Sequence, residues 1–351
     1  MAGDRCATRR ISSDRCGTRR FLVGKAGNVT RGLVVVSGAA GFVGRALCAH
    51  FVSTGVPCRG IVRAEPPGSS ARDTPVVLGD LATTPDERLA AAVEGAFAVV
   101  HLAGRAHVLR ETAPAAAAAC HAANVIATQR LALAAAGAGV QRFVLAGTLK
   151  VHGEASAPGR AFRADDPYAP QDAYAQSKVD AERALVAACS GTPMVPILLR
   201  LPLVYGPGVR ANFLALLDAI ARRAPLPLRS IDNRRDLLYV GNLVSAIAAL
   251  LDRPEPPRGA WLIADGEPVS TPDLVRRIAA ALGVAPRLWP VPLPLLEAAA
   301  RLAGRRAEFL RIASSLAVDA SPLARLIGPP PFTLDQGLAA TAKWWRARHA
   351  I

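Results

Sequence analysis

Short apolar runs alternate with stretches of helical periodicity along most of the chain. Apolar runs typical of buried strands occupy residues 33–36, 59–63, 76–78, 98–102, 143–146 and 195–199. Helical patterns lie between them, notably over residues 42–53, 113–137 and 172–189. Strands that alternate with helices pair in parallel through crossover connections. The pattern therefore predicts an α/β fold built on a doubly wound parallel sheet of the Rossmann type.

The pattern loosens after Gly206, where proline-rich breaks separate further helices. Helical periods remain near residues 211–223, 242–252, 271–282 and 334–348. We expect a dinucleotide-binding Rossmann domain over 32–203 that also receives elements from 233–265. The segments 204–232 and 266–351 are expected to form a smaller, mostly helical lobe that binds the substrate.

Composition narrows the class of protein. Of the 351 residues, 51% are hydrophobic and 20% charged, which is enough apolar material for a sizeable core and excludes global disorder. The six cysteines form no CxxC pair and the six histidines show no ligand spacing, so neither a disulfide framework nor a metal site is expected. No apolar run is a convincing bilayer span, so we expect a cytoplasmic protein without membrane insertion.

The net charge of +15 is unevenly distributed along the chain. Residues 1–32 carry eight basic and two acidic side chains, and a decapeptide beginning at Asp4 recurs at Asp14. We expect residues 1–31 to be a disordered basic extension outside the fold. The remaining positive charge has few aromatic residues among it, so no nucleic acid is expected as a partner. Anionic small substrates, such as nucleotide diphosphates, fit this charge equally well.

A glycine-rich segment follows the first predicted strand and opens the first predicted helix. It reads SGAAGFVG over residues 37–44. Gly38 allows a tight turn, Gly41 lets backbone N–H groups approach a pyrophosphate, and Gly44 lets the helix pack on the strand. The free N–H groups and the dipole of the helix then supply an anion site. This placement favours a dinucleotide site over a simple strand–helix turn.

Two residues beyond this segment bear on the choice of cofactor. The second predicted strand ends at Arg63, without the acidic residue that usually binds the adenosine ribose. Arg63 is suited to a 2′-phosphate, which keeps NADP open beside NAD, or it is a plain surface arginine. Asp80 follows the third predicted strand, where it either binds the adenine amino group or serves as a turn or cap residue.

A tyrosine and a lysine lie four residues apart on one face of the helix predicted over 172–189. An ammonium beside a phenol stabilises the phenolate, and a nicotinamide cation adds to that effect. We therefore expect the pKa of Tyr174 to move from about 10 toward neutrality, which would make it a usable base. Lys178 is one of only four lysines in an arginine-dominated chain. Thr148 ends the fifth predicted strand, at the edge where such sheets bind ligands, unless it merely caps the strand end.

In these motifs the chain resembles the extended short-chain dehydrogenase/reductase family, in its NAD-dependent epimerase/dehydratase branch. The resemblance rests on GAAGFVG at 38–44, HLAG at 101–104, AGTLKVHGE at 146–154, YAQSKVDAE at 174–182, LLRLPLVYGPG at 198–208 and RRDLLYV at 234–240. It implies that Thr148 is the catalytic hydroxyl, Tyr174 the acid/base, and Lys178 its activator and a ribose ligand. It also implies a set of cofactor-binding residues, which are Gly38, Gly41, Phe42, Val43, Gly44, Arg63, Asp80, Leu81, Ala103, Gly104, Asn124, Tyr174, Lys178 and Leu201.

The same resemblance implies substrate contacts. Arg235 is similar to an arginine that binds the pyrophosphate of a sugar nucleotide, with a surface ion pair to Asp236 or Asp232 as the alternative. Asn212 is similar to a loop residue that lies over the nucleotide, and a plain helix start is nearly as well supported. Lys150 is taken as substrate-binding. Relatives are often dimers through a helix bundle, so a homodimer is one further expectation.

One departure from the family bears on the reaction. The 4,6-dehydratases carry an Asp-Glu pair after the catalytic threonine, where this chain has Leu149 and Lys150, so a dehydratase is not expected. We expect NAD(P)-dependent hydride transfer at C4 of a UDP sugar, as a 4-epimerase of a UDP-hexose or UDP-N-acetylhexosamine. An NADPH-dependent 4-ketoreductase of a UDP-4-keto-6-deoxy-N-acetylhexosamine is the first alternative, and a non-catalytic dinucleotide-binding regulatory protein is the second.

Overall fold

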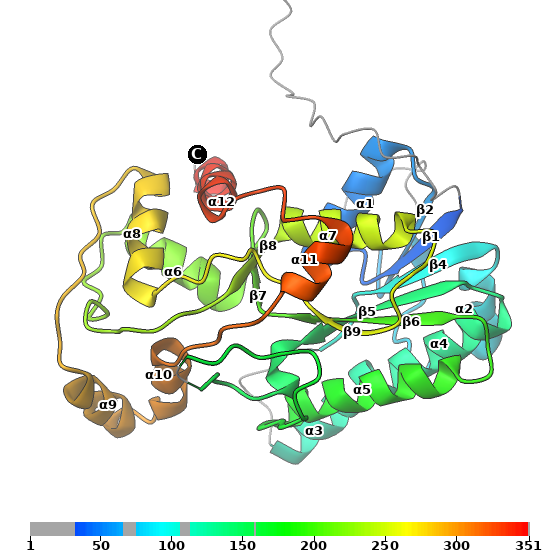
Figure 1. Ribbon diagram of the computed structural model, residues 1–351, viewed down its shortest axis with the longest axis horizontal. Coiled ribbons are helices and arrows are strands. Elements are labelled where there is room, and N and C mark those ends of the chain that lie inside the picture. The colour runs from blue at the N-terminus through cyan, green and yellow to red at the C-terminus, as the bar shows by residue number, and fades with distance from the viewer. Residues whose placement is uncertain (1–31, 66–74, 106–112, 158, 350–351) are drawn as a thin grey trace, which may run out of the picture.

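A single parallel sheet of seven strands lies at the centre of the protein, whose computed structural model describes residues 32–65, 75–105, 113–157 and 159–349 (Figure 1). The predicted extension at 1–31 falls outside these residues. The strand order is β3-β2-β1-β4-β5-β6-β9, and every neighbouring pair is parallel. The strands are β1 (Leu33–Ser37), β2 (Cys58–Val62), β3 (Val76–Val77), β4 (Ala96–His101), β5 (Arg142–Thr148), β6 (Val195–Leu201) and β9 (Gly259–Leu262).

The order of strands reverses at β1. The chain runs outward through β2 and β3 and then crosses to β4 on the other side of β1. Connections leave β1 and β4 in opposite directions, so a crevice forms outside the carboxyl ends of these two strands. This crevice is the expected ligand position in a doubly wound sheet, and the predicted fold class is confirmed.

Helices cover both faces of the sheet (Figure 1). One face carries α1 (Phe42–Thr54), α7 (Val240–Asp252) and α11 (Ser321–Ile327), and the other carries α2 (Asp86–Val93), α4 (Ala127–Gly137) and α5 (Ala173–Cys189). Successive side chains of a strand point to opposite faces. Val34 and Val36 accordingly join the core under α1 and α7, whereas Val35 joins the core under α2, α4 and α5. Both faces are buried, which explains why the strands are continuous apolar runs.

The long helix predicted over 113–137 is present, with a change of winding in its middle. It consists of α3 (Ala113–Cys120), the π-helical turn η1 (His121–Ile126) and α4. A π-helical turn widens the helix locally and is frequent at functional sites. Here the turn contains Asn124, whose side chain is buried.

The remaining helices form a further hydrophobic core beside the sheet, in a C-terminal lobe. Two short parallel strands, β7 (Leu203–Tyr205) and β8 (Leu237–Tyr239), connect it to the sheet layer. Around them pack α6 (Ala211–Ala221), α8 (Thr271–Leu282) and α12 (Leu334–His349). Tyr205, Phe213 and Leu338 are among its buried side chains. Two more helices, α9 (Leu293–Leu302) and α10 (Arg306–Ala313), pack against each other at the margin of this lobe (Figure 1).

The six predicted strands and the predicted helices are all confirmed, and β9 joins the sheet beside β6 from within 233–265. Four helices were not predicted, namely α2, α9, α10 and α11. The helix α9 begins inside one of the proline-rich segments that were predicted to separate helices. Pro294 occupies its first turn, where no intrahelical N–H is needed, so this proline is compatible with a helix start. In the described part of the chain, no helix combines the length and the apolar character that crossing a membrane requires.

Two adjacent residues of α5 test how the sheet is stabilised. Leu185 is fully buried against the sheet, whereas Val186 is 49% exposed. We expect Leu185→Ala to lower the free energy of unfolding by about 2–5 kcal/mol, because it leaves a cavity in the core. Val186→Ala should change it by less than about 1 kcal/mol. Urea denaturation measures both, and equal losses would contradict this packing.

Candidate active site

The glycine turn between β1 and α1 fits a dinucleotide pyrophosphate. Gly38 has a φ of +70°, a conformation that favours glycine. A Cβ on Gly44 would lie 2.2 Å from the carbonyl oxygen of Gly38, so only glycine allows this close approach. The helix α1 starts after Gly41 with no side-chain cap and no acidic residue in its first turn. Its first N–H groups are therefore available to an anion.

The opposite wall of this crevice is ordered by a buried asparagine. Asn124 accepts a hydrogen bond from the backbone N–H of Arg105 (2.8 Å) and donates to the Ser177 hydroxyl of α5 (2.9 Å). Gly104 lies against it, because a Cβ there would come within 3.0 Å of the Asn124 Oδ1 atom and 3.6 Å of Lys178 Nζ. The π-helical turn thus holds the loop after β4 against α5.

A buried histidine connects the ends of β1 and β4. Thr128 donates to the carbonyl oxygen of Asn124 (2.5 Å), so it accepts from Nε2 of His101 (3.1 Å). The other ring nitrogen then accepts from the Ser37 hydroxyl (2.5 Å), which itself accepts from the N–H of Ala103 (3.3 Å). Burial and the charge of Lys178 lower the pKa of His101 to about 3, so the ring is neutral. The motif HLAG predicted Ala103 at the site, but sequence analysis missed the role of His101 in placing it.

The three predicted catalytic residues come together at the carboxyl end of β5. Thr148 ends β5, and its hydroxyl is hydrogen-bonded to the phenol of Tyr174 in the first turn of α5. The Thr148 oxygen also accepts from the backbone N–H of Lys150 (3.3 Å), which leaves its own proton available to donate to Tyr174. Lys178 is buried one turn along α5 and donates to the carbonyl oxygen of Ala146 (2.7 Å). This arrangement brings a hydroxyl and a phenol into contact, with a buried ammonium one helical turn along α5 from the phenol.

The pKa of Tyr174 does not shift in the direction that the sequence predicted. Burial raises the pKa of Tyr174 to about 12, helped by the charge of Asp172, while the bond from Thr148 lowers it. Burial lowers the pKa of Lys178 to about 8, against the opposing effect of Glu182. The pKa of Tyr174 therefore does not move toward neutrality in the protein alone, because burial disfavours the charged phenolate.

The predicted residues on the adenosine side follow the ends of β2 and β3. Ala39 donates its N–H to Ile61 of β2 (3.2 Å), and the exposed Arg63 follows two residues later. Asp80 forms a turn, with its carboxylate accepting from the N–H of Ala82 (3.0 Å), so the turn role named above is present. The side chain of Leu81 is buried in the core, which leaves its backbone for any cofactor contact.

Three further predicted cofactor residues lie at the boundary between the core under α1 and the core of the C-terminal lobe. Phe42 packs against the core of the C-terminal lobe and Val43 against the core under α1. Leu201 ends β6 directly beside Thr148 in the sheet register. The first turn of α1 and the end of β6 thus lie at the same edge of the sheet as Thr148.

The predicted substrate residues are anchored in different ways. The Arg235 guanidinium donates from Nη1 to the carbonyl oxygens of Arg311 (2.5 Å) and Ser314 (2.8 Å) at the end of α10. The alternative ion pair with Asp232 or Asp236 is not among those of the described residues. Asn212 is exposed in the first turn of α6, which fits a plain helix start as well as a loop over a nucleotide.

The residue after Thr148 points into an apolar cluster. Leu149 is buried with Leu262 and Leu316. No carboxylate stands at this position, where the 4,6-dehydratases carry an aspartate. The short 3-10 turn η2 (Leu149–Val151) then brings Lys150 back to the site side, where its amine meets two carboxylates.

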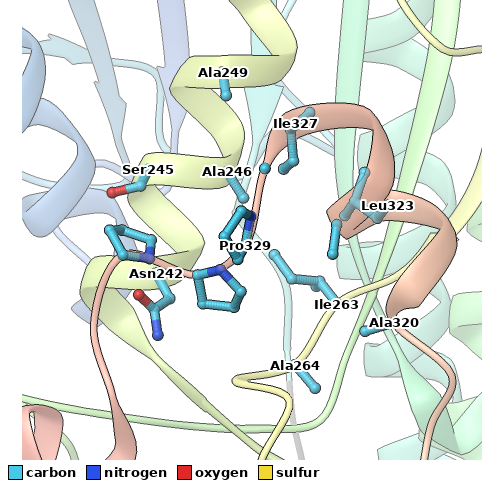
Figure 2. A pocket seen from close by; sticks show the side chains of 14 residues that line it. Asn242, Ser245, Ala246, Ala249, Ile263, Ala264, Ala320, Leu323, Ile327 and Pro329 are labelled. Atoms are coloured by element: carbon cyan, nitrogen blue, oxygen red, sulfur yellow. The ribbon is translucent and has the colours of Figure 1, made fainter. Parts of the chain in front are cut away.

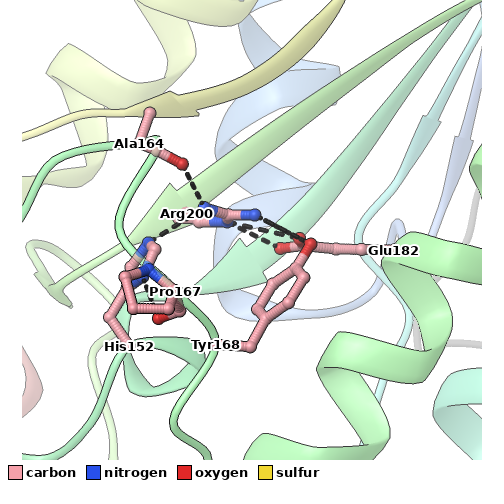
Figure 3. Close-up of polar contacts among 6 residues, drawn as sticks. All are labelled: His152, Ala164, Pro167, Tyr168, Glu182 and Arg200. Atoms are coloured by element: carbon pink, nitrogen blue, oxygen red, sulfur yellow. Dashed lines mark hydrogen bonds and ion pairs between the residues drawn. The ribbon is translucent and has the colours of Figure 1, made fainter.

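A buried ion pair joins β6 to α5 (Figure 3). Arg200 of β6 binds Glu182 of α5 (2.7 Å), and both side chains are at most 4% exposed. Arg200 also donates to Nε2 of His152 (2.9 Å), whose Nδ1 atom binds the carbonyl oxygen of Pro167 (3.2 Å), and to the Tyr168 hydroxyl (3.0 Å). Both ring nitrogens of His152 therefore have partners, so it is a satisfied structural histidine.

Sequence analysis missed the role of this ion pair. Glu182 stands one turn beyond Lys178 in the segment YAQSKVDAE, and its charge raises the pKa of the lysine. An acidic residue four positions after a buried lysine on the same helix face was the available signal.

An apolar cavity lies on the α7 side of the sheet, away from these groups (Figure 2). It is lined by α7, α11 and Pro329–Pro331, and it contains none of the predicted site residues. Asn242, a polar residue in its wall, already binds Asp265 (2.7 Å) and the carbonyl oxygen of Phe332 (2.9 Å). The cavity therefore offers little to orient a polar ligand.

Two glycines in helices test the cofactor site. A Cβ on Gly44 would collide with the glycine turn, whereas a Cβ on Gly137 at the end of α4 would meet no atom within 4 Å. We expect Gly44→Ala to weaken NAD binding about tenfold or more, because a displacement costing about 1.4 kcal/mol has that effect. Gly137→Ala should leave NAD affinity unchanged and stabilise its helix by about 0.5–1 kcal/mol. Titration calorimetry measures the affinities, and unaltered binding in Gly44→Ala would contradict the assignment.

Comparisons with known proteins agree with this geometry. The family model described as NAD dependent epimerase/dehydratase family matches residues 34–264. A UDP-glucose 4-epimerase of Vibrio cholerae is 33% identical over 314 residues, which is 88% of this chain and 94% of that protein. A 2-alkyl-3-oxoalkanoate reductase of Stenotrophomonas maltophilia is 30% identical over 73% of this chain and 77% of its own.

A solved structure shows the same fold. MoeE5 in complex with UDP-glucose and NAD superimposes with a TM-score of 0.71 at 27% identity, covering 91% of this chain and all of that one. The family match spans the sheet, the glycine turn and the residues Thr148, Tyr174 and Lys178. The chain therefore belongs to the NAD-dependent epimerase/dehydratase family, whose members include enzymes of nucleotide-sugar metabolism.

Proposed function

We propose that this protein is a 4-epimerase of a UDP-hexose or a UDP-N-acetylhexosamine that works by hydride transfer at C4. The observation that carries the proposal is the hydrogen bond between Thr148 and Tyr174 beside the buried Lys178. A relative described as a UDP-glucose 4-epimerase and a similar structure that holds UDP-glucose and NAD support the substrate class.

The residues around the crevice fit NAD. The glycine turn would hold the pyrophosphate, Ala103 and Gly104 would line the nicotinamide side, and Lys178 would bind the ribose. When bound, NAD supplies an acceptor for the hydride from C4 and a donor for its return. Asn124 and His101 hold the wall of the crevice in place, and both side chains are neutral.

The protein's own residues handle the proton. Tyr174 would take the proton of the 4-hydroxyl while Thr148 donates a hydrogen bond that steadies the developing oxygen charge. After the 4-keto sugar turns its other face, the same phenol would return the proton. Because the pKa of Tyr174 is about 12 in the protein alone, Lys178 and the positive nicotinamide ring must together lower it for this step.

Arg235 is the proposed ligand of the pyrophosphate of the substrate. The end of α10 fixes its guanidinium through two backbone carbonyl oxygens, and a fixed planar guanidinium suits bidentate phosphate binding. We also propose that Asn212 lies over the nucleotide of the substrate. The proposal retains two expectations from the sequence, a cytoplasmic location and a homodimer, the second of which light scattering would test.

One alternative has its own observation. Arg63 is exposed just after β2, where NAD-specific sites carry an acid, so a 2′-phosphate would be accepted there. This favours the NADPH-dependent 4-ketoreductase as the second candidate. A non-catalytic regulatory protein is less supported, since it would leave the buried Thr148, Tyr174 and Lys178 without a purpose.

Removing the phenol hydroxyl tests the assigned chemistry. We expect Tyr174→Phe to lower kcat for UDP-sugar turnover at least about 100-fold, the usual scale for losing an acid/base group. NAD affinity should stay within about twofold. The measurement is a coupled assay with UDP-glucose, UDP-galactose and their N-acetyl derivatives, next to calorimetric titration with NAD. Full turnover by the variant would contradict the role of Tyr174.

The nature of the retained cofactor separates the two candidate reactions. An epimerase returns its hydride in each cycle, so we expect NAD to remain bound through purification and no net reduction during turnover. Mass spectrometry of the ligands in the purified protein measures the first, and absorbance at the reduced nicotinamide band measures the second. Stoichiometric NADPH oxidation by a UDP-4-keto-6-deoxy-N-acetylhexosamine would instead establish the ketoreductase.

A further inference from the structure

Lys150 is held between two carboxylates close to the catalytic residues. Its amine binds Glu154 (2.8 Å) and Asp172 (2.9 Å), and its side chain is one-quarter exposed. Glu154 is in turn 3.4 Å from Arg311 of α10. The backbone of the same lysine donates its N–H to the Thr148 hydroxyl. Lys150 thus contacts the catalytic threonine on one side and Asp172 on the other.

Asp172 determines where the catalytic helix begins. It is the N-cap of α5, and its side chain accepts from the backbone N–H of Ala175 at 2.6 Å. Its carbonyl oxygen accepts from the N–H of Gln176 at 3.0 Å. Tyr174 stands in this first turn, two residues beyond the cap. Any shift of the Asp172 carboxylate therefore moves the phenol relative to Thr148.

We propose that Lys150 is a positioning residue for catalysis: it anchors the Asp172 cap of α5 to the η2 turn and so fixes Tyr174 against Thr148, rather than binding the substrate. This inference rests on the proposed function for its kinetic consequences. It replaces the expectation that Lys150 binds the sugar nucleotide, because Glu154 and Asp172 already engage its amine.

Through its ion pair with Asp172, Lys150 also affects the pKa of Tyr174. The phenol faces Thr148 of β5, Cys120 of α3 and, on its own helix, Asp172; Lys178 follows one turn on. Asp172 raises the pKa of Tyr174, and the Lys150 ammonium, itself shared with Glu154, offsets part of that carboxylate charge. Loss of the lysine would leave Asp172 less compensated, so the phenol would ionise at higher pH.

The decisive experiment compares lysine variants in the full-length protein. We expect Lys150→Met to lower kcat about 10- to 100-fold with KM within about twofold, because a small displacement of a catalytic group has this effect on the chemical step. The acid limb of its kcat–pH profile should move to higher pH. Lys343→Met is the matched control, since Lys343 is exposed on α12, and it should change neither parameter.

A second variant separates the effect of charge from the effect of position. Asparagine caps helices as well as aspartate does, so Asp172→Asn keeps the cap and removes the charge. We expect the double variant Lys150→Met with Asp172→Asn to move the acid limb back toward lower pH. Lys150→Arg keeps a cation and should restore part of the lost kcat. A rise in KM with unchanged kcat in Lys150→Met would show substrate binding instead and would overturn the proposal.

Amide hydrogen exchange distinguishes a failure of this inference from a failure of the proposed function. Absence of turnover by the unaltered protein on every UDP sugar would contradict the proposed function alone. In that case the first turn of α5, measured at Ala175 and Gln176, should still exchange faster in Lys150→Met than in Lys343→Met. Equal exchange rates in the two variants would overturn the positioning role.

Discussion

The burial of the Lys178 ammonium between β5 and α5 is the constraint on which the rest of the site depends. Removing a cation from water costs several kcal/mol unless polar groups replace the lost hydration. Here the carbonyl oxygen of Ala146 accepts one of its protons, and Glu182 attracts its charge from one turn away. Because these partners belong to β5 and α5, the cation ties the strand that ends at Thr148 to the helix that carries Tyr174.

Glu182 introduces a second buried charge, which Arg200 balances. The pair is almost completely excluded from water, and removing one partner of such a pair typically costs about 3–5 kcal/mol. Tyr168 and His152 supply further hydrogen bonds to Arg200, so the loops after β5 and before α5 are bound to the same group. The network therefore stabilises the strand that ends at Thr148 and the helix that carries Tyr174.

The sheet layer and the C-terminal lobe meet at the crevice, and each contributes residues to it. The sheet layer supplies the glycine turn, Thr148, Tyr174 and Lys178, and α10 holds Arg235 through backbone carbonyl oxygens. Arg311 of α10 also approaches Glu154, which shares Lys150 with the cap of α5. A chain of polar contacts therefore connects the arginine proposed for the pyrophosphate with the helix that carries the proposed acid/base, Tyr174.

The sequence by itself determined the sheet, the glycine turn and the Thr148, Tyr174 and Lys178 set. These depend on local patterns, since strands buried on both faces are continuous apolar runs and residues four apart share a helix face. Tertiary structure alone decided the partners of Lys150, Arg200 and His101, because each lies at least 18 residues from a contact that defines its role. It also decided the pKa of Tyr174, since burial of the phenol raises that pKa where the sequence predicted a fall.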